Sequence, residues 1–206
     1  MSRARPVRWG LVAATLLSLA LIVALRARQP SFDEKTAPMP VAGTIGQPVQ
    51  ARTFSIKVKR VKLAHAYRVD GRSRGDPPRE VAADGVWLSA LVEAERSRSS
   101  GYVGAQLRTR DGRRFRAAPN GRPDLKGFNL TDTYLATGLP AGGAYFFDVP
   151  AEALDGATLQ FFDGNGAPAQ LDHLVDVDVG LDAPNVESLL AEAAPVLDLT
   201  TPGPAR

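Results

Sequence analysis

The sequence contains no cysteine among its 206 residues. This absence excludes disulfide bridges, thiolate zinc sites, iron–sulfur clusters and cysteine nucleophiles together. A domain of ordinary size does not need disulfides when its core is large enough, so a place outside the cell remains compatible with the sequence. Histidine is also scarce, with two residues, His65 and His173. Two histidines far apart in sequence do not make a metal site, and we expect a structural or solvated role for each.

Motifs of catalytic and phosphate-binding sites are missing as well. The chain has no Gly-x-Ser-x-Gly motif, and its glycine-rich stretches, 71–75 and 138–143, lack the Gly-Lys-Ser/Thr ending of a phosphate loop. Asp172, Asp176 and Asp178, followed by Asp182, offer the hard oxygen ligands that calcium prefers. In one strand they would be spread along a face, whereas a calcium cage needs a tight loop. We therefore expect no catalytic residue, no cofactor and no bound metal.

One run lacks charge altogether. The 17 residues from 9 to 25 are apolar except for Thr15 and Ser18. At about 1.5 Å per residue, such a helix spans about 25 Å, near the ~30 Å of a bilayer core. The alternative is a cleaved signal peptide, whose apolar region usually has only ~7–15 residues and ends at a small-x-small site. This run is longer and continues into Arg26, so we expect an uncleaved anchor.

The charges that flank this run suggest its orientation. Arg3, Arg5 and Arg8 precede it, and the positive-inside bias slightly favours an inner N-terminus. We expect a basic cytoplasmic tail over 1–8, a transmembrane helix over 9–25 and a Pro/Gly-rich linker over 26–48. The remainder would then lie outside the cell membrane.

Short apolar runs separated by glycine and proline follow the linker, as in all-β proteins. They predict a β-sandwich over 49–183, then a short helix and a disordered tail over 184–206. Asn185 is the expected cap of that helix, over 186–194. About eight strands are expected: 53–63, 86–95, 102–109, 113–117, 128–137, 144–149, 157–162 and 171–181.

Two local patterns are specific. Phe54, Ile56 and Val58 alternate with polar residues, and Val61 and Leu63 continue the alternation one position out of phase. A single slip in a period of two is typical of a β-bulge. The Asp-Gly pair at 111–112 predicts a hairpin between its flanking strands, and 68–84 is expected to be a polar loop.

Several segments resemble a bacterial family, the extracellular immunoglobulin-like domains once called immunoprotective. The resemblance covers about 45–165 and lies in the apolar rhythm of 54–63, the stretch 85–94, the Asp-Gly hairpin and Phe146-Phe-Asp-Val-Pro150. It implies an immunoglobulin-like fold placed outside the membrane, with no reaction attached. This chain departs from the family in having Glu93-Ala-Glu95 where members usually have an Asn, and in lacking a lipidated cysteine.

Charge is divided between the two halves of the domain. Residues 52–126 hold 18 Lys/Arg and 8 Asp/Glu, whereas 127–206 hold 1 Arg and 12 Asp/Glu. Interleaved early and late strands would neutralise each other. Alternatively, a basic face would bind an anionic envelope polymer, lipid head groups or an acidic membrane-protein partner. Nucleic acid is a poor candidate because aromatic residues are not interleaved. The candidate residues of this face are Arg72, Arg74, Arg79, Arg108, Arg110, Arg113, Arg114 and Arg116.

These features favour a membrane-anchored, extracytoplasmic immunoglobulin-like module that binds or assists a partner and is not an enzyme. The alternative is a cell-envelope hydrolase that uses Asp and Glu residues. Clustered carboxylates in one cleft would favour that alternative.

Overall fold

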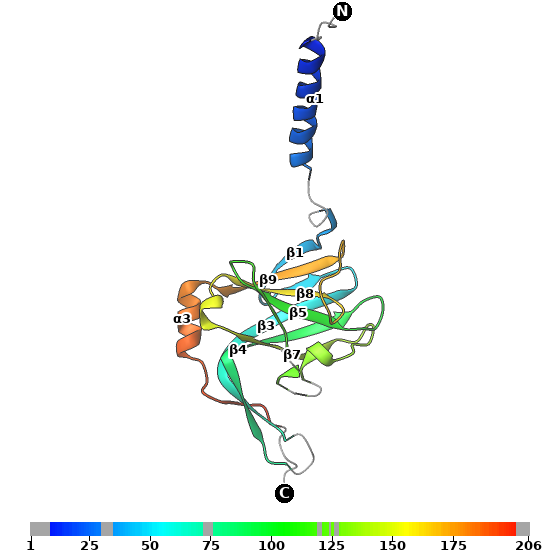
Figure 1. Cartoon of the computed structure of the whole chain (residues 1–206). Coiled ribbons are helices and arrows are strands. Elements are labelled where there is room, and N and C mark those ends of the chain that lie inside the picture. The colour runs from blue at the N-terminus through cyan, green and yellow to red at the C-terminus, as the bar shows by residue number, and fades with distance from the viewer. Residues whose placement is uncertain are drawn as a thin grey trace, which may run out of the picture. The chain divides into compact units, whose positions relative to one another are not determined.

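The structure is a computed structural model that describes residues 9–29, 35–71, 76–118, 121–123, 125 and 128–200. The chain forms two compact units, Met1–Ala37 and Pro38–Arg206. The first contains the helix α1 (Trp9–Ala27), and the second contains the strands (Figure 1). The expected basic tail over 1–8 lies outside the described residues.

Helix α1 extends two residues beyond the predicted apolar run. None of its 19 residues is buried, and a mean hydropathy of 2.1 over an 18-residue window makes it long and apolar enough to cross a membrane. The Thr15 hydroxyl donates to the Leu11 carbonyl at 2.9 Å, so this polar group is satisfied within the helix. By length and composition the helix fits a membrane anchor or a signal sequence.

The second unit is a β-sandwich, as predicted, with ten strands rather than about eight in the described residues. One sheet has the order β1 (Met39–Thr44), β9 (His173–Leu181), β8 (Ala157–Asp163), β5 (Val103–Arg108), β6 (Arg114–Arg116). The other has the order β10 (Leu197–Asp198), β3 (Phe54–Val69), β4 (Arg79–Arg96), β7 (Ala141–Val149), and β2 (Pro48–Gln50) pairs with β3. The short helices are η2 (Leu130–Asp132), η3 (Ala151–Ala153) and α3 (Ala183–Ala191).

Alternating apolar residues of both sheets form the main core between them. We call this cluster the inner core; Phe54, Leu88, Tyr145, Phe147 and Phe161 are among its largest side chains. The predicted bulge is confirmed, because the register of β3 against β4 shifts between Val58 and Arg60. The Asp-Gly hairpin is also confirmed, between β5 and β6.

The expected polar loop over 68–84 is wrong in most of its length. Strands β3 and β4 continue to Val69 and from Arg79, and they leave the sandwich as a two-stranded ribbon (Figure 1). Apolar residues explain the extension: a second cluster lies on the face of β3, β4 and β7 opposite the inner core. We call it the outer cluster; it comprises Ala64, Tyr67, Val69, Val81, Trp87, Ala144 and Phe146. The segment that ends in β10 packs against it.

The expected linker over 26–48 is too long, because residues 39–48 belong to the sandwich. Strand β1 pairs in parallel with β9, from Met39 opposite His173 to Thr44 opposite Asp178. Pro40 is tolerated because β1 is an edge strand. Packing favours glycine at position 43, since a Cβ there would overlap the Cγ2 of Val49.

Two other expectations fail for local reasons. The strand expected over 128–137 is replaced by isolated bridges and η2, because the Asn129 side chain accepts from Thr131 N and caps that turn. The helix expected from Val186 starts earlier: Asp182, rather than Asn185, is its N-cap and accepts from Asn185 N at 3.2 Å. Pro at N1/N2 is compatible with this start.

Candidate functional site

The predicted basic face is not one face. Arg72 and Arg74 lie outside the described residues. Arg79 lies on the ribbon, opposite Val69, whereas the other five arginines surround the β5–β6 hairpin in the other sheet. The structure therefore groups those five and leaves Arg79 apart from them.

Carboxylates partner three arginines of the hairpin. Arg108 contacts Asp176 at 2.9 Å, Arg110 contacts Asp155 at 3.0 Å and Arg113 contacts Asp111 at 2.8 Å. The remaining two, Arg114 and Arg116, are exposed on β6 and have no ion-pair partner among the described residues. Two free guanidinium groups on a short edge strand remain as candidates for contact with an anionic partner.

Ion pairs join the basic and acidic halves, as the neutralising interpretation predicts. The pairs that link residues 52–126 to residues 127–206 are Arg52–Asp172, Arg96–Asp163, Arg108–Asp176, Arg110–Asp155 and Arg122–Asp148. The most buried is Arg96, whose side chain is 3% exposed and lies 2.7 Å from Asp163. A hydrogen bond from Arg52, opposed by partial burial, holds the pKa of Asp172 below its usual value. The divided charge of the chain thus serves, in good part, to pair strands within the domain.

The carboxylates that suggested calcium ligation have other partners. Asp176 accepts from Arg108 and Gln160, Asp178 from Gly180 N, and Asp182 caps α3. Within the described ranges no three His, Asp or Glu side chains are grouped as metal ligands would be. His65 and His173 belong to different sheets.

An open cleft carries Asp84, Asp148 and Glu152, the grouping that a hydrolase would use. Asp148, however, accepts from the backbone N–H groups of Asp84 and Gly85 at 3.0–3.2 Å and from Arg122 at 3.4 Å. These contacts tie Asp84 and Gly85 of β4 to Asp148 of β7. Because the Asp148 carboxylate already accepts these hydrogen bonds, it is a structural group rather than a free general acid or base.

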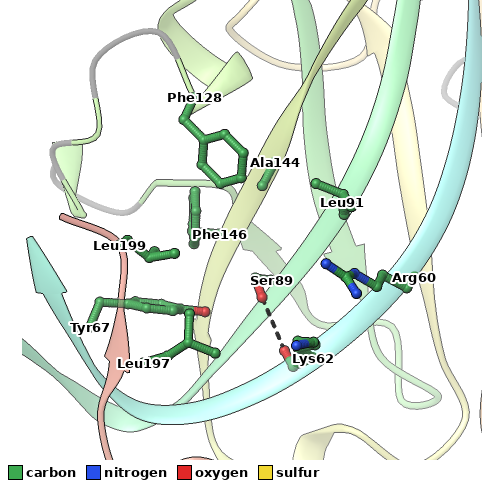
Figure 2. Close-up of a pocket in the computed structure, with 10 residues that line it drawn as sticks. All are labelled: Arg60, Lys62, Tyr67, Ser89, Leu91, Phe128, Ala144, Phe146, Leu197 and Leu199. Carbon is green, nitrogen blue, oxygen red and sulfur yellow. Dashed lines mark hydrogen bonds between the residues drawn. The ribbon is translucent and has the colours of Figure 1, made fainter. Parts of the chain in front are cut away.

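A small pocket opens on the outer face of β3, β4 and β7, beside the outer cluster. Its volume is about 100 Å³ (Figure 2). Two cross-strand rows build its floor, Lys62–Ser89–Phe146 and Arg60–Leu91–Ala144. Phe128, Leu197 and Leu199 also line the pocket. The walls are apolar except at the β3 side.

The bulge in β3 places the two cations of this pocket. Because the register slips between Val58 and Arg60, Arg60 and Lys62 face outward while Val61 and Leu63 face the inner core. Neighbouring cations have acidic partners, Lys59 with Glu93 at 2.7 Å and Arg68 with Glu80 at 2.8 Å. In the described part of the chain, no carboxylate pairs with Arg60 or Lys62.

Tyr67 supplies a buried polar group to the same pocket. Its side chain is 1% exposed, and its hydroxyl has no hydrogen-bond partner in the described structure. Burial raises the pKa of Tyr67 to about 12, and the nearby Ser89 hydroxyl opposes that rise only in part. Ser89 itself donates to the Lys62 carbonyl at 3.3 Å. Figure 2 shows the Tyr67 oxygen directed toward Ser89, on the side where Arg60 and Lys62 lie.

Sequence reasoning missed this pocket, although part of its signal was present. The stretch 86–95 has apolar residues on both faces, which indicated a central strand with a second covered surface. The phase slip also implied that Arg60 and Lys62 face away from the inner core. The approach of Leu197 and Leu199 had no sequence signal, because it depends on the parallel pairing of β10 with Tyr67 and Arg68.

Comparisons with known proteins add little. No family model matches this chain, and no curated protein matches it. Three solved structures are similar. An uncharacterized β-sandwich protein from Clostridium difficile has 12% identity and a TM-score of 0.44, and the match covers 72% of this chain and 99% of that chain. The yjhA protein from Bacillus subtilis has 20% identity, a TM-score of 0.44 and coverages of 66% and 99%, and the secreted protein MPT63 from Mycobacterium tuberculosis has 18% identity, a TM-score of 0.43 and coverages of 67% and 98%. At these identities and TM-scores, the fold rests on the strand pairing described above, and no function is carried over.

Proposed function

We propose that this chain is a membrane-anchored binding module whose β-sandwich lies outside the membrane and carries no catalytic site. The observation that supports it most directly is α1, a 19-residue apolar helix with no buried residue. At about 1.5 Å per residue it spans roughly 28 Å, close to the ~30 Å of a bilayer core. By length and composition such a helix fits a bilayer, either as an anchor or as a signal sequence.

Strand order supports an immunoglobulin-like classification of the sandwich. Strand β4 lies between β3 and β7, and β8 lies between β9 and β5. With β3, β4, β5, β7, β8 and β9 taken as strands A, B, C, E, F and G, the sheets read A-B-E and G-F-C. These are the sheets of the immunoglobulin fold, with its fourth strand D absent from the first sheet and β6 added beside C.

The surface supports a role in binding. Arg114 and Arg116 would contact an anionic envelope polymer or an acidic membrane-protein partner, and the pocket on the opposite sheet would take a small ligand. In an anchored module both surfaces would be confined to the layer next to the membrane.

Cysteine labelling tests the placement, because the chain has no native cysteine. Gln47, exposed in the turn between β1 and β2, is replaced by cysteine, and Ser2 is replaced in a matched variant. A membrane-impermeant maleimide should label Gln47→Cys in intact cells and Ser2→Cys only after lysis. The reverse pattern would overturn the proposed orientation.

Intact mass separates an anchor from a signal sequence. The full mass of 21.9 kDa in the membrane fraction supports the anchor. A shorter chain that has lost α1 and is released from the membrane would overturn it.

A further inference from the structure

We propose that the pocket between Tyr67, Phe146 and Leu197 binds a small carboxylic acid that bears one branched-alkyl or phenyl group. This inference rests on the proposed binding function and names its ligand class. It combines three independent features of the described residues: an apolar cavity, two cations that have no acidic partner there and a buried hydroxyl that has no hydrogen-bond partner there.

The apolar walls set the size of the ligand's apolar group. Leu91, Phe128, Phe146, Leu197 and Leu199 surround a cavity of about 100 Å³ (Figure 2). A cavity of roughly 150 Å³ holds benzene in other proteins, so this one takes a branched chain of a few carbons, or a ring that extends into the mouth.

The polar side sets the charge of the ligand. Arg60 and Lys62 are neighbours on one face of β3 and lack acidic partners, whereas Lys59 and Arg68 nearby are paired. A carboxylate between them would form charge-assisted hydrogen bonds, which are about twice as strong as neutral ones. A neutral amide of the same shape would leave both cations uncompensated.

The Tyr67 hydroxyl provides the third contact. A buried hydroxyl without a partner is rare in folded proteins and has a cost that a ligand oxygen would remove. At neutral pH the group is protonated and is therefore a donor, which suits a carboxylate acceptor. Its direction toward Ser89 places that donor on the same side as both cations.

The experiment uses the full chain in nanodiscs of zwitterionic lipid, in a Trp9→Phe background. The chain has two tryptophans, so Trp87 then remains as the fluorescent reporter, with its ring 5.8 Å from that of Tyr67. The probes are 4-methylpentanoate and, as a neutral isostere, 4-methylpentanamide. We expect the acid to bind with a Kd on the order of 0.1–1 mM, and the amide about 10-fold more weakly.

Variants assign the contacts. Arg60→Gln with Lys62→Gln should weaken the acid about 10-fold or more and leave the amide unchanged. Tyr67→Phe should weaken the acid about 5-fold while the apolar walls stay intact. The matched control is Lys35→Gln with Arg98→Gln, which removes the same charge at two exposed residues that do not line the pocket and should change nothing. Equal binding of acid and amide, or equal weakening by both double variants, would overturn the proposal.

A second probe identifies the source of the carboxylate. N-acetylleucine has the same side chain and carboxylate but mimics the C-terminal residue of a peptide. Tighter binding of 4-methylpentanoate supports a free acid, whereas tighter binding of N-acetylleucine supports a peptide terminus as the source of the same chemistry. If 4-methylpentanoate does not bind but Gln47→Cys is labelled in intact cells, the proposed ligand class is wrong and the anchored module stands. If 4-methylpentanoate binds but Gln47→Cys is labelled only after lysis, the ligand class stands and the proposed placement outside the membrane is wrong.

Discussion

The inner core and the outer cluster lie on opposite faces of the same three strands, β3, β4 and β7. They differ in whether a buried tyrosine hydroxyl has a hydrogen-bond partner among the described residues. In the inner core the Tyr145 hydroxyl donates to the Val103 carbonyl at 2.6 Å. In the outer cluster the Tyr67 hydroxyl has no partner, and a cavity lies beside it. The two aromatic neighbours on β7, Phe146 and Phe147, belong to different clusters. The inner core satisfies its buried tyrosine hydroxyl, whereas the packing of the outer cluster is interrupted by a pocket.

The largest expected losses of stability come from substitutions of these two phenylalanines. Phe147→Ala empties a closed site between two sheets and should lower the free energy of unfolding by about 3–5 kcal/mol. Phe146→Ala enlarges an existing cavity under a short segment that can move inward, so its cost should be about 1 kcal/mol less. Urea unfolding of the full chain in mild detergent, followed by Trp87 fluorescence in the Trp9→Phe background, measures both. Equal costs would mean that the outer cluster is as tightly packed as the inner core.

Two arginines extend the comparison to charged groups. Arg96 is buried and bonded to Asp163 at 2.7 Å, to Ser99 O at 2.8 Å and to Tyr102 O at 3.2 Å. Arg96→Met leaves Asp163, whose side chain is 28% exposed, and two backbone carbonyls without their buried donor, and should cost about 3 kcal/mol. Arg60→Gln, at the pocket, should change stability by less than about 0.5 kcal/mol. The same urea titration tests both, and a stability loss at Arg60 above 1 kcal/mol would reveal a structural role instead.

The sequence predicted features that depend on neighbours along the chain. The phase slip after Val58 predicted the β3 bulge, and the Asp-Gly pair predicted the β5–β6 hairpin. Features that depend on distant pairing were missed. Strand β1 gains its partner about 130 residues later, and the pocket needs Leu197 and Leu199 to approach Tyr67. The alternation of apolar and polar residues cannot predict such contacts, because the pattern within a segment does not depend on which distant segment it pairs with.

Alkaline pH should affect the outer cluster through Tyr67. Its pKa is raised from 10.0 to about 12 in the folded state, so the unfolded chain loses this proton first. Stability from this group is complete below pH 10 and is lost as the pH rises toward 12. At pH 11 the loss is about 1.4 kcal/mol, one pKa unit. Tyr67→Phe should therefore show a shallower decline between pH 9.5 and 11 than the parent protein. Parallel declines would show that Tyr67 ionises at its ordinary pKa.

The smallest expected effects come from removing each tyrosine hydroxyl at neutral pH. Tyr145→Phe breaks the 2.6 Å hydrogen bond to Val103 and should destabilise the domain by about 1 kcal/mol. Tyr67→Phe removes a hydroxyl that has no partner, so it should be neutral or stabilising by up to about 1 kcal/mol. The two substitutions delete the same atom from the same residue type, and both side chains are almost fully buried. A difference in sign therefore reports the partner rather than the burial. If Tyr67→Phe instead destabilises as much as Tyr145→Phe, its hydroxyl is already satisfied within the fold, and the pocket loses the donor that a carboxylate would need.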